Sequence, residues 1–227
     1  MNILVLGKGK TGTLVAEIAQ ERGHEARAIG SAENVGGKAL SREALANVDV
    51  VLDFTTPHAI LENIATCVRA GGTMVVGTTG WYDKIPQVRQ LVEQSGTGFV
   101  FGANFSVGVN IFFDIARAVA PALNLGYTGQ VIERHHVTKK DKPSGTAVAI
   151  NKVLNARTGK SLEIESVREG NVVGDHEIRL ESGNDVITLA HSAKTRRGFA
   201  EGAVRAAEWI NGKSGFYDFQ DVWKQLK

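Results

Sequence analysis

The first residues of the chain restrict its fold more than any other stretch. Residues 2–6 are an apolar run suited to a strand buried on both faces, and Gly7-Lys8-Gly9-Lys10-Thr11-Gly12 follows it directly. Residues 13–22 then repeat apolar side chains at helical spacing, and Gly23 ends the pattern. A strand, a glycine-rich turn and a helix in this order predict a βαβ unit that binds a dinucleotide, because the glycines permit a tight turn, a close pyrophosphate and close helix packing. A purely structural turn is the alternative.

The alternation of strand and helix continues to about residue 104. Strand-like runs are expected at 25–29, 48–54, 73–76 and 98–101, with helical patterns at 59–69 and 85–94 between the last three of them. Such alternation predicts an α/β fold with a Rossmann-like, doubly wound parallel sheet.

The pattern changes in the second half of the chain. A long apolar helix is expected at 109–123, broken near Pro121, and another helix at 144–156. Strand-like runs are expected at 128–134, 162–168, 174–181 and 185–193. These strands predict a second, α+β domain with a largely antiparallel or mixed sheet.

The C-terminal segment is expected to return to the first domain. It holds a helical pattern at 199–211 and then an aromatic-rich end. We therefore expect a dinucleotide-binding domain made of residues 1–105 plus 197–227. Residues 106–196 would form a domain for substrate binding and oligomerisation.

Composition excludes several classes of function. The formal net charge of +2 gives no basic field for nucleic acid, and no apolar run approaches the ~18 residues of a membrane helix. The N-terminal apolar run is too short for a signal peptide. Cys67 is the only cysteine, which excludes an intrachain disulfide and a cysteine-based zinc site and fits a cytoplasmic location.

The choice of nicotinamide cofactor stays open. A carboxylate that binds the ribose is expected about 20 residues after the turn, where this chain has Ser31. Serine does not repel a 2′-phosphate, and Lys8 and Lys10 could attract one, so the expected cofactor is NADH or NADPH, and use of both is an open alternative. The run Gly77-Thr78-Thr79-Gly80 follows a strand and suits contact with the nicotinamide half, unless it is an ordinary loop.

A second motif concentrates titratable groups within residues 133–147. His135 and His136 end a strand, so their side chains should point to opposite sides, and histidine suits proton transfer near neutral pH. Lys139 is a positive charge and a potential proton donor. Ser144 or Thr146 could cap the following helix, and the N–H groups of Gly145 and Thr146 could bind a carboxylate. A small dianionic molecule would find these groups together; a solvated surface loop is the alternative.

The sequence lacks the residue spacing of two other kinds of active site, a zinc site and a serine hydrolase. His135, His136, His176 and His191 lack the spacing of a zinc site, so no metal is expected. A Ser/His/Asp hydrolase is not indicated either, because no Gly-x-Ser-x-Gly elbow is present.

The chain resembles the dihydrodipicolinate reductase family. The main resemblance is Glu133-Arg134-His135-His136 with Lys139, followed by Asp141-Lys142-Pro143-Ser144-Gly145-Thr146-Ala147. The other matching segments, in chain order, are Asp53-Phe54-Thr55, Gly77-Thr78-Thr79-Gly80, Ala103-Asn104-Phe105-Ser106-Val107-Gly108-Val109-Asn110 and Gly202-Ala203-Val204-Arg205-Ala206-Ala207. They span nearly the whole chain.

The resemblance implies an oxidoreductase that reduces 4-hydroxy-tetrahydrodipicolinate with NADH or NADPH, in lysine biosynthesis through diaminopimelate. It also implies a cytoplasmic homotetramer with no nucleic-acid or membrane partner. His135 falls on the family's acid/base histidine and Lys139 on its proton donor.

The resemblance also assigns binding positions. Substrate-binding positions are His136, Lys139, Ser144, Gly145, Thr146 and Arg196. Cofactor-binding positions are Gly7, Lys8, Gly9, Lys10, Thr11, Gly12, Ser31, Gly77, Thr78, Thr79, Gly102, Ala103, Asn104 and Phe105.

Three departures from the family pattern and two rival functions remain. The first turn is one residue shorter than in many members, Ser31 replaces an acidic residue, and a stretch that usually precedes residues 167–176 is missing. One rival is an amino-acid or diamino-acid dehydrogenase with a similar layout. The other is a dinucleotide-binding sensor without catalysis, which would lack a second, anion-selective site.

Overall fold

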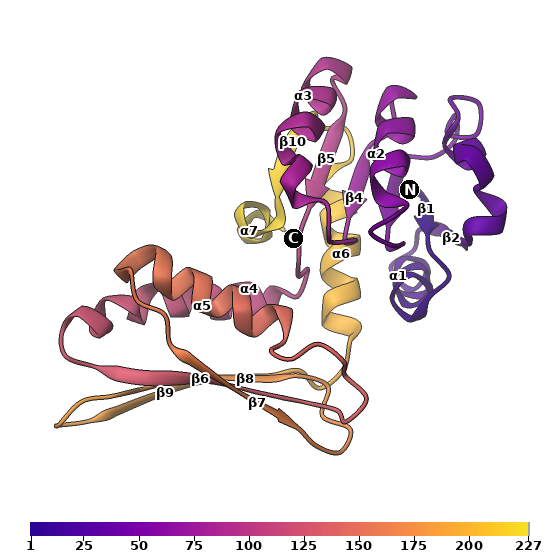
Figure 1. The fold of residues 1–227 in the computed structure, drawn as a ribbon. Coiled ribbons are helices and arrows are strands. Elements are labelled where there is room, and N and C mark those ends of the chain that lie inside the picture. The colour runs from indigo at the N-terminus through magenta and orange to yellow at the C-terminus, as the bar shows by residue number, and fades with distance from the viewer. Residues whose placement is uncertain (227) are drawn as a thin grey trace. The chain divides into compact units, whose positions relative to one another are not determined.

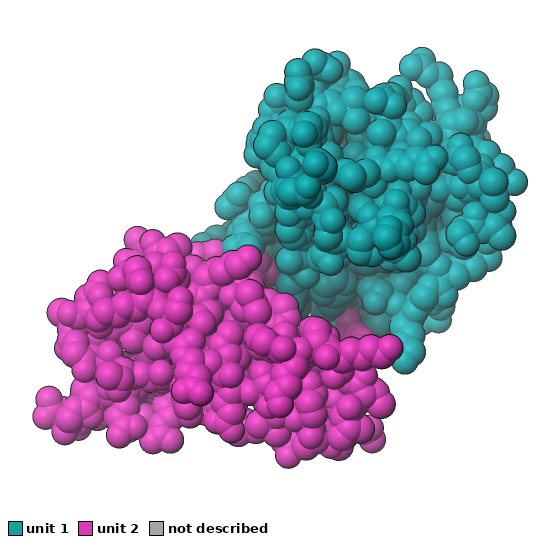
Figure 2. Space-filling view, in the orientation of Figure 1, with its two compact units in different colours: residues 1–107, 197–227 teal, residues 108–196 magenta. Residues whose placement is uncertain are grey.

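The computed structural model describes residues 1–226, which divide into two compact units. Residues 1–107 with 197–227 form unit 1, and residues 108–196 form unit 2 (Figure 2). The chain thus leaves unit 1 once and returns to it.

Unit 1 is a parallel sheet with helices on both faces (Figure 1). Its six strands have the order β10-β5-β4-β3-β1-β2, and every neighbouring pair is parallel. Its main elements are β1 (Asn2–Leu6), α1 (Lys10–Glu21), β2 (Glu25–Ile29), β3 (Val50–Asp53), α2 (Ile60–Arg69), β4 (Met74–Val76), α3 (Ile85–Ser95), β5 (Gly98–Phe101), α6 (Arg197–Ile210), β10 (Gly215–Asp218) and α7 (Phe219–Val222). Short 3-10 segments lie at Ser31–Glu33, Val35–Leu40, Tyr82–Lys84 and Trp223–Gln225.

Each face of this sheet has its own core. Successive residues of a strand point to opposite faces, so Ile3 and Val5 pack with α1 and α6, whereas Leu4 and Leu6 pack with α2 and α3. The continuous apolar run at the N-terminus is therefore explained by burial on both sides. The expected doubly wound α/β fold is confirmed.

Unit 2 is a sheet with helices on one face. Its strands have the order β7-β6-β8-β9, with β6 and β7 parallel and the other two pairs antiparallel. Helices α4 and α5 pack on the same core residues of this sheet and lie along one side of it in Figure 1. Its elements are α4 (Val107–Val119), a 3-10 segment (Ala120–Asn124), β6 (Thr128–His135), α5 (Gly145–Thr158), β7 (Glu163–Arg168), β8 (Asp175–Glu181) and β9 (Val186–Ser192). The sheet is mixed because α5 forms a crossover between β6 and β7.

Two local details differ from the sequence prediction. Helix α1 begins at Lys10 rather than at residue 13, because Gly9 is the extended residue before the helix and Gly12 lies inside its first turn. Strand β10 is not visible in the sequence pattern, since it has four residues and pairs with β5, more than a hundred residues away. Phe216 of β10 stacks on Phe99 with ring centroids 5.2 Å apart.

No helix within residues 1–226 has both the length and the apolar character that a membrane span requires.

Candidate active site

The three glycines in the turn between β1 and α1 differ in backbone conformation and in the space around them. Gly7 has a φ of +108°, which side chains disfavour, and its N–H donates to the Ile29 carbonyl at 2.8 Å. A Cβ on the buried Gly12 would collide with the Gly7 carbonyl oxygen. A Cβ on Gly9 would meet no protein atom within 4 Å, and no side chain caps the start of α1. The turn therefore offers open space and a helix N-terminus, which together suit a phosphate.

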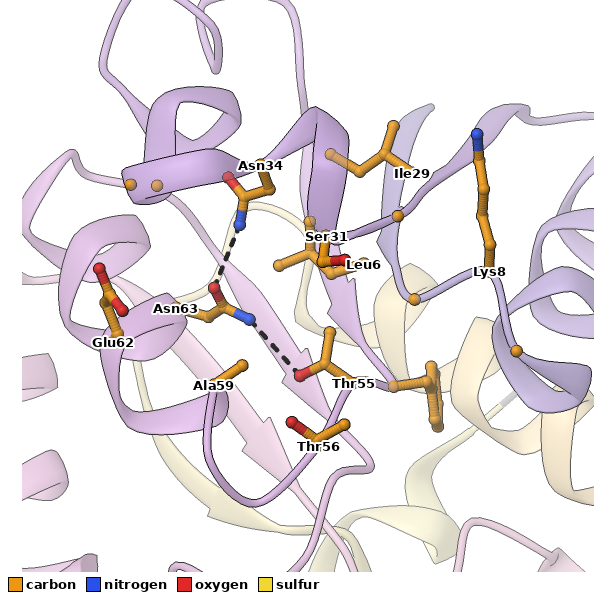
Figure 3. Close-up of a pocket in the computed structure, with 16 residues that line it drawn as sticks. Leu6, Lys8, Ile29, Ser31, Asn34, Thr55, Thr56, Ala59, Glu62 and Asn63 are labelled. Carbon is orange, nitrogen blue, oxygen red and sulfur yellow. Dashed lines mark hydrogen bonds between the residues drawn. The ribbon is translucent and has the colours of Figure 1, made fainter.

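A cavity of about 370 Å³ opens beside this turn (Figure 3). Gly7, Lys8, Gly9 and Ser31, which the sequence indicates, contribute to its wall. Asn34 and Asn63 lie at another part of the wall, and their side chains are hydrogen-bonded at 3.1 Å. These features fit one half of a dinucleotide cofactor: a glycine turn with open space at Gly9, and a cavity lined by both polar and apolar residues.

The remaining cofactor candidates do not line this cavity. Lys10 and Thr11 lie at the start of α1, and Gly12 packs beneath the turn. Residues 77–79 and 102–105 follow β4 and β5. Because β1, β3, β4 and β5 are parallel, the segments after them lie along the same sheet edge as the glycine turn.

Two side chains in these segments, those of Thr78 and Phe105, contact other parts of unit 1. The Thr78 hydroxyl donates to the Asp53 carboxylate at 2.7 Å, and the Thr55 N–H donates to Thr78 at 2.8 Å. Asp53 is fully buried. Burial raises the pKa of its carboxyl, although four hydrogen bonds to the carboxylate act to lower it. Phe105 is buried among aromatic rings, whereas Thr79 is exposed. Backbone groups are thus the main means by which these segments could contact a cofactor.

In unit 2, His135 lies at the end of β6 beside a carboxylate, that of Glu133, which is in turn bound by the guanidinium of Arg168. The imidazole Nδ1 is hydrogen-bonded to the carboxylate of Glu133, which is fully buried. Arg168 on β7 binds the same carboxylate with two N–H groups, at 3.0 and 2.8 Å. Burial lowers the pKa of His135 although Glu133 acts to raise it. His135 is therefore shifted toward the neutral form.

His136 points away from that cluster, as expected for the next residue of a strand. Its Nδ1 is hydrogen-bonded to the Thr138 hydroxyl at 2.7 Å. Arg196 donates to its Nε2 at 3.4 Å, although sixty residues separate the two. The structure therefore brings Arg196 to the histidine pair, which sequence spacing alone does not show.

Lys139 and the start of α5 complete the loop. The Lys139 ammonium lies 2.8 Å from Asp141, and its side chain is 22% exposed. Ser144 is the residue before α5, and its hydroxyl accepts from the Ala147 N–H at 3.2 Å. Gly145 and Thr146 follow in the first helical turn, where the helix carries partial positive charge. His135, His136, Lys139, Arg196 and this helix start all belong to unit 2.

Three residues that hold this site had no predicted role in it. They are Glu133, Arg168 and the buried His176, whose Nε2 lies 3.1 Å from the Ser144 hydroxyl. One signal was available for Glu133, because a charged side chain in a strand requires a partner if it is buried. Nothing in the local pattern identified Arg168 as that partner. Residues 1–226 contain no group of three or more histidine, cysteine or acidic side chains arranged to hold a metal ion.

His176 is expected to make stability depend on pH. Burial lowers its pKa to about 4, with His135 acting in the same direction, whereas the ordinary value is 6.5. Below pH 6.5 the unfolded chain binds the proton more readily than the folded chain. His176 should therefore reduce the free energy of unfolding by up to about 1.4 kcal/mol per pH unit as pH falls toward 4.

Urea unfolding at pH 7 and pH 5 measures this effect. His176→Gln should show a smaller stability difference between the two pH values than the unchanged protein. His58→Gln at an exposed position is the matched control and should keep the full difference. Equal differences in all three proteins would contradict the assignment.

Comparisons with known proteins agree with the two units. The family model "Dihydrodipicolinate reductase, N-terminus" matches residues 1–105, and "Dihydrodipicolinate reductase, C-terminus" matches residues 108–223. A 4-hydroxy-tetrahydrodipicolinate reductase of Christiangramia forsetii is 34% identical over 240 residues, covering 100% of this chain and 99% of that protein. One from Neisseria meningitidis is 38% identical over 237 residues, covering 92% and 87%.

A solved structure has the same fold. It is described as a dipicolinate-bound dihydrodipicolinate reductase from Paenisporosarcina sp. TG-14. It matches with a TM-score of 0.80 at 21% identity and covers 98% of this chain and 99% of that one. The chain therefore belongs to the dihydrodipicolinate reductase family, whose members are oxidoreductases that reduce 4-hydroxy-tetrahydrodipicolinate in the diaminopimelate route to lysine.

Proposed function

We propose that the loop between β6 and α5 binds the cyclic dicarboxylate and supplies the proton for its reduction. The observation that carries this proposal is the gathering of His135, His136, Lys139, Arg196 and the start of α5 in unit 2. A substrate with two carboxylates requires several positive or donor groups, together with one group able to transfer a proton.

Carboxylate binding is assigned to the more accessible groups. Arg196 is exposed and Lys139 is partly exposed, so both can turn toward a ligand. His136 holds the Arg196 guanidinium near the loop, and Ser144, Gly145 and Thr146 present the helix N-terminus. Contacts to the two carboxylates would fix the ring relative to His135, and such positioning contributes several kcal/mol, roughly, to catalysis.

The chemistry divides between the two units. A reduced nicotinamide held in unit 1 would supply the hydride for the ring carbon distal to the imine nitrogen. Negative charge then develops through the conjugated system, and His135 or Lys139 donates the proton that neutralises it. The substrate gains a hydride and a proton, while the nicotinamide cofactor is oxidised.

A titration with pyridine-2,6-dicarboxylate tests the second, anion-selective site. We expect this dicarboxylate to bind more tightly than pyridine-2-carboxylate, which lacks the second carboxylate. The dissociation constants should differ by about tenfold or more for each charged contact that the monocarboxylate cannot make. Arg196→Ala should reduce that preference, whereas Arg157→Ala, on the last turn of α5, should not. Equal affinity for both compounds would contradict the proposal and favour a dinucleotide-binding sensor.

Lys8 is proposed to support the use of NADPH beside NADH. Its ammonium lies 2.6 Å from Glu33 at the cavity where Ser31 replaces a carboxylate. Lys8→Ala is expected to raise the KM for NADPH by about tenfold and to leave the KM for NADH within about twofold, because a 2′-phosphate contact is lost. Lys10→Ala is the comparison, since Lys10 lies outside the cavity wall, and it should change both values less. Equal effects of Lys8→Ala on both cofactors would refute this role.

The assembly is proposed to be a homotetramer formed through unit 2. One face of its sheet is packed on α4 and α5, whereas the opposite face carries exposed residues such as Glu165, Arg179 and Val186. Light scattering coupled to gel filtration measures the mass directly, and a monomer at micromolar concentration would contradict the proposal. A cytoplasmic location is proposed with it, since Cys67 is a buried free thiol.

A further inference from the structure

The buried Glu133 carboxylate joins three separated parts of unit 2. Its side chain has no exposed surface. It accepts hydrogen bonds from His135 Nδ1 on the same strand and from both terminal nitrogens of Arg168 on β7. It also accepts from the Ser144 N–H at 3.3 Å, at the start of α5. Both ends of the loop that carries Lys139 are therefore attached to one carboxylate.

The charge state of Glu133 fixes the tautomer of His135. Burial alone would raise the pKa of Glu133, but hydrogen bonds from Arg168, Ser166 and His135 outweigh it and lower the pKa to about 2. An ionised carboxylate only accepts hydrogen bonds, so the Nδ1 of His135 must carry the hydrogen. In the neutral imidazole, Nε2 is then left with its lone pair, so His135 must take up a proton at Nε2 before it can donate one to the substrate.

The second ring nitrogen of His135, Nε2, is left without a hydrogen-bond partner by its surroundings within the described chain. Gly174 lies directly beside it, and a Cβ at that position would be 3.0 Å from Nε2. His135 as a whole is buried, and a glycine at position 174 leaves beside Nε2 the room that a larger side chain would fill.

Arg168 holds the carboxylate and the loop together. Its side chain is 14% exposed, and its Nη1 donates to the Val167 carbonyl at 2.7 Å. Its Nη2 donates at 2.6 Å to the main-chain carbonyl of Asp141, the residue whose carboxylate is the ion-pair partner of Lys139. One planar guanidinium thus fixes both Glu133 and the backbone near Lys139, a geometry that a lysine could not reproduce.

From these contacts we infer that Glu133 and Arg168 are positioning residues for the reduction. Glu133 holds His135 as the Nδ1–H tautomer with Nε2 directed to the substrate, and Arg168 fixes Glu133 and the Lys139 loop in one arrangement. The inference rests on the proposed function for its role in turnover, but the tautomer is a property of the protein alone.

The direct test is a long-range ¹H–¹⁵N NMR spectrum of the full chain labelled with ¹⁵N-histidine, recorded at pH 8 without ligands. His135→Gln identifies the His135 signals among the six histidines. We expect His135 to show hydrogen on Nδ1. An Nε2–H tautomer, or an equal mixture, would overturn the inference even if the enzyme is active. Absence of turnover with an Nδ1–H signal would instead overturn the proposed function.

A double variant separates positioning from folding. Glu133→Met with Arg168→Met removes the ion pair at similar volume, a change that buried pairs often tolerate, whereas either single change leaves a buried charge unpaired. We expect His135 to lose its Nδ1–H preference and kcat to fall by about 10- to 100-fold. The KM for the cofactor should stay within about twofold, because the unit 1 cavity is untouched.

The matched control replaces a partly exposed ion pair elsewhere in unit 2. Arg117→Met with Asp114→Met removes a pair whose charged atoms are 2.5 Å apart on α4. Its tautomer spectrum and kcat should equal those of the unchanged protein. A folded Glu133/Arg168 double variant with an unchanged tautomer and an unchanged kcat would overturn the inference.

Discussion

Lys139→Ala is expected to lower kcat/KM for the dicarboxylate by about 100-fold or more. The change removes a positive charge that we propose binds a substrate carboxylate, and it removes one of the two candidate proton donors; loss of such a donor alone costs about 10²- to 10⁴-fold. The effect should appear in kcat and in substrate affinity together. Stopped-flow and steady-state measurements with each cofactor separate the two.

The same loop offers matched controls for this change. Lys140 and Lys142 are exposed neighbours of Lys139. Alanine at either position removes the same charge from the same loop without removing the ion pair to Asp141. Their kcat/KM values should stay within a few-fold of the unchanged protein. If Lys140→Ala were as damaging as Lys139→Ala, general loop charge rather than a specific contact would explain the loss.

Gly12→Ala is expected to destabilise unit 1 and to abolish cofactor binding. The added Cβ would overlap the Gly7 carbonyl oxygen, so the turn and α1 must move apart. Overpacking of this kind costs about 1 to 3 kcal/mol, which corresponds to a fall in Tm of roughly 3 to 10 °C for a chain of this size. Thermal unfolding and a cofactor titration measure the two effects.

Gly9→Ala is the contrasting variant in the same turn. Gly9 has φ −74° and ψ 178°, which alanine adopts without strain, and its Cβ would meet no protein atom. Its Tm should therefore be unchanged, while the methyl group in the phosphate space should weaken cofactor binding by about tenfold. Unchanged cofactor affinity in Gly9→Ala would show that the pyrophosphate does not approach this turn.

Local sequence patterns predicted much of the fold because they reflect burial. The strands at 25–29 and 98–101 have the predicted bounds; the first alternates charged and apolar residues between glycines, and the second is an apolar run. The helix broken near Pro121 appears as α4 followed by a 3-10 segment. The doubly wound sheet follows from the alternation of such elements. Strand β10 was missed because its only support is distant, through pairing with β5 and contact with Phe99.

The candidate site was predictable to a lesser extent. The residues between His135 and Thr146 are adjacent in the chain, so their sequence alone groups them. Arg168 comes from another strand, and its contact with Glu133 depends on the parallel pairing of β6 with β7. Likewise Asn34 and Asn63 meet at the cavity only because the chain folds back there. Periodicity describes burial within an element, whereas these contacts depend on which elements become neighbours.

The most direct test of the account is turnover of freshly generated 4-hydroxy-tetrahydrodipicolinate, followed by the loss of nicotinamide absorbance. Parallel assays with NADH and NADPH use the full chain, with Lys139→Ala and Lys140→Ala beside it. We expect turnover with both cofactors, near-complete loss in Lys139→Ala and little change in Lys140→Ala. Cofactor binding without turnover with either nucleotide would contradict this expectation and would favour a dehydrogenase of open-chain amines or a non-catalytic sensor.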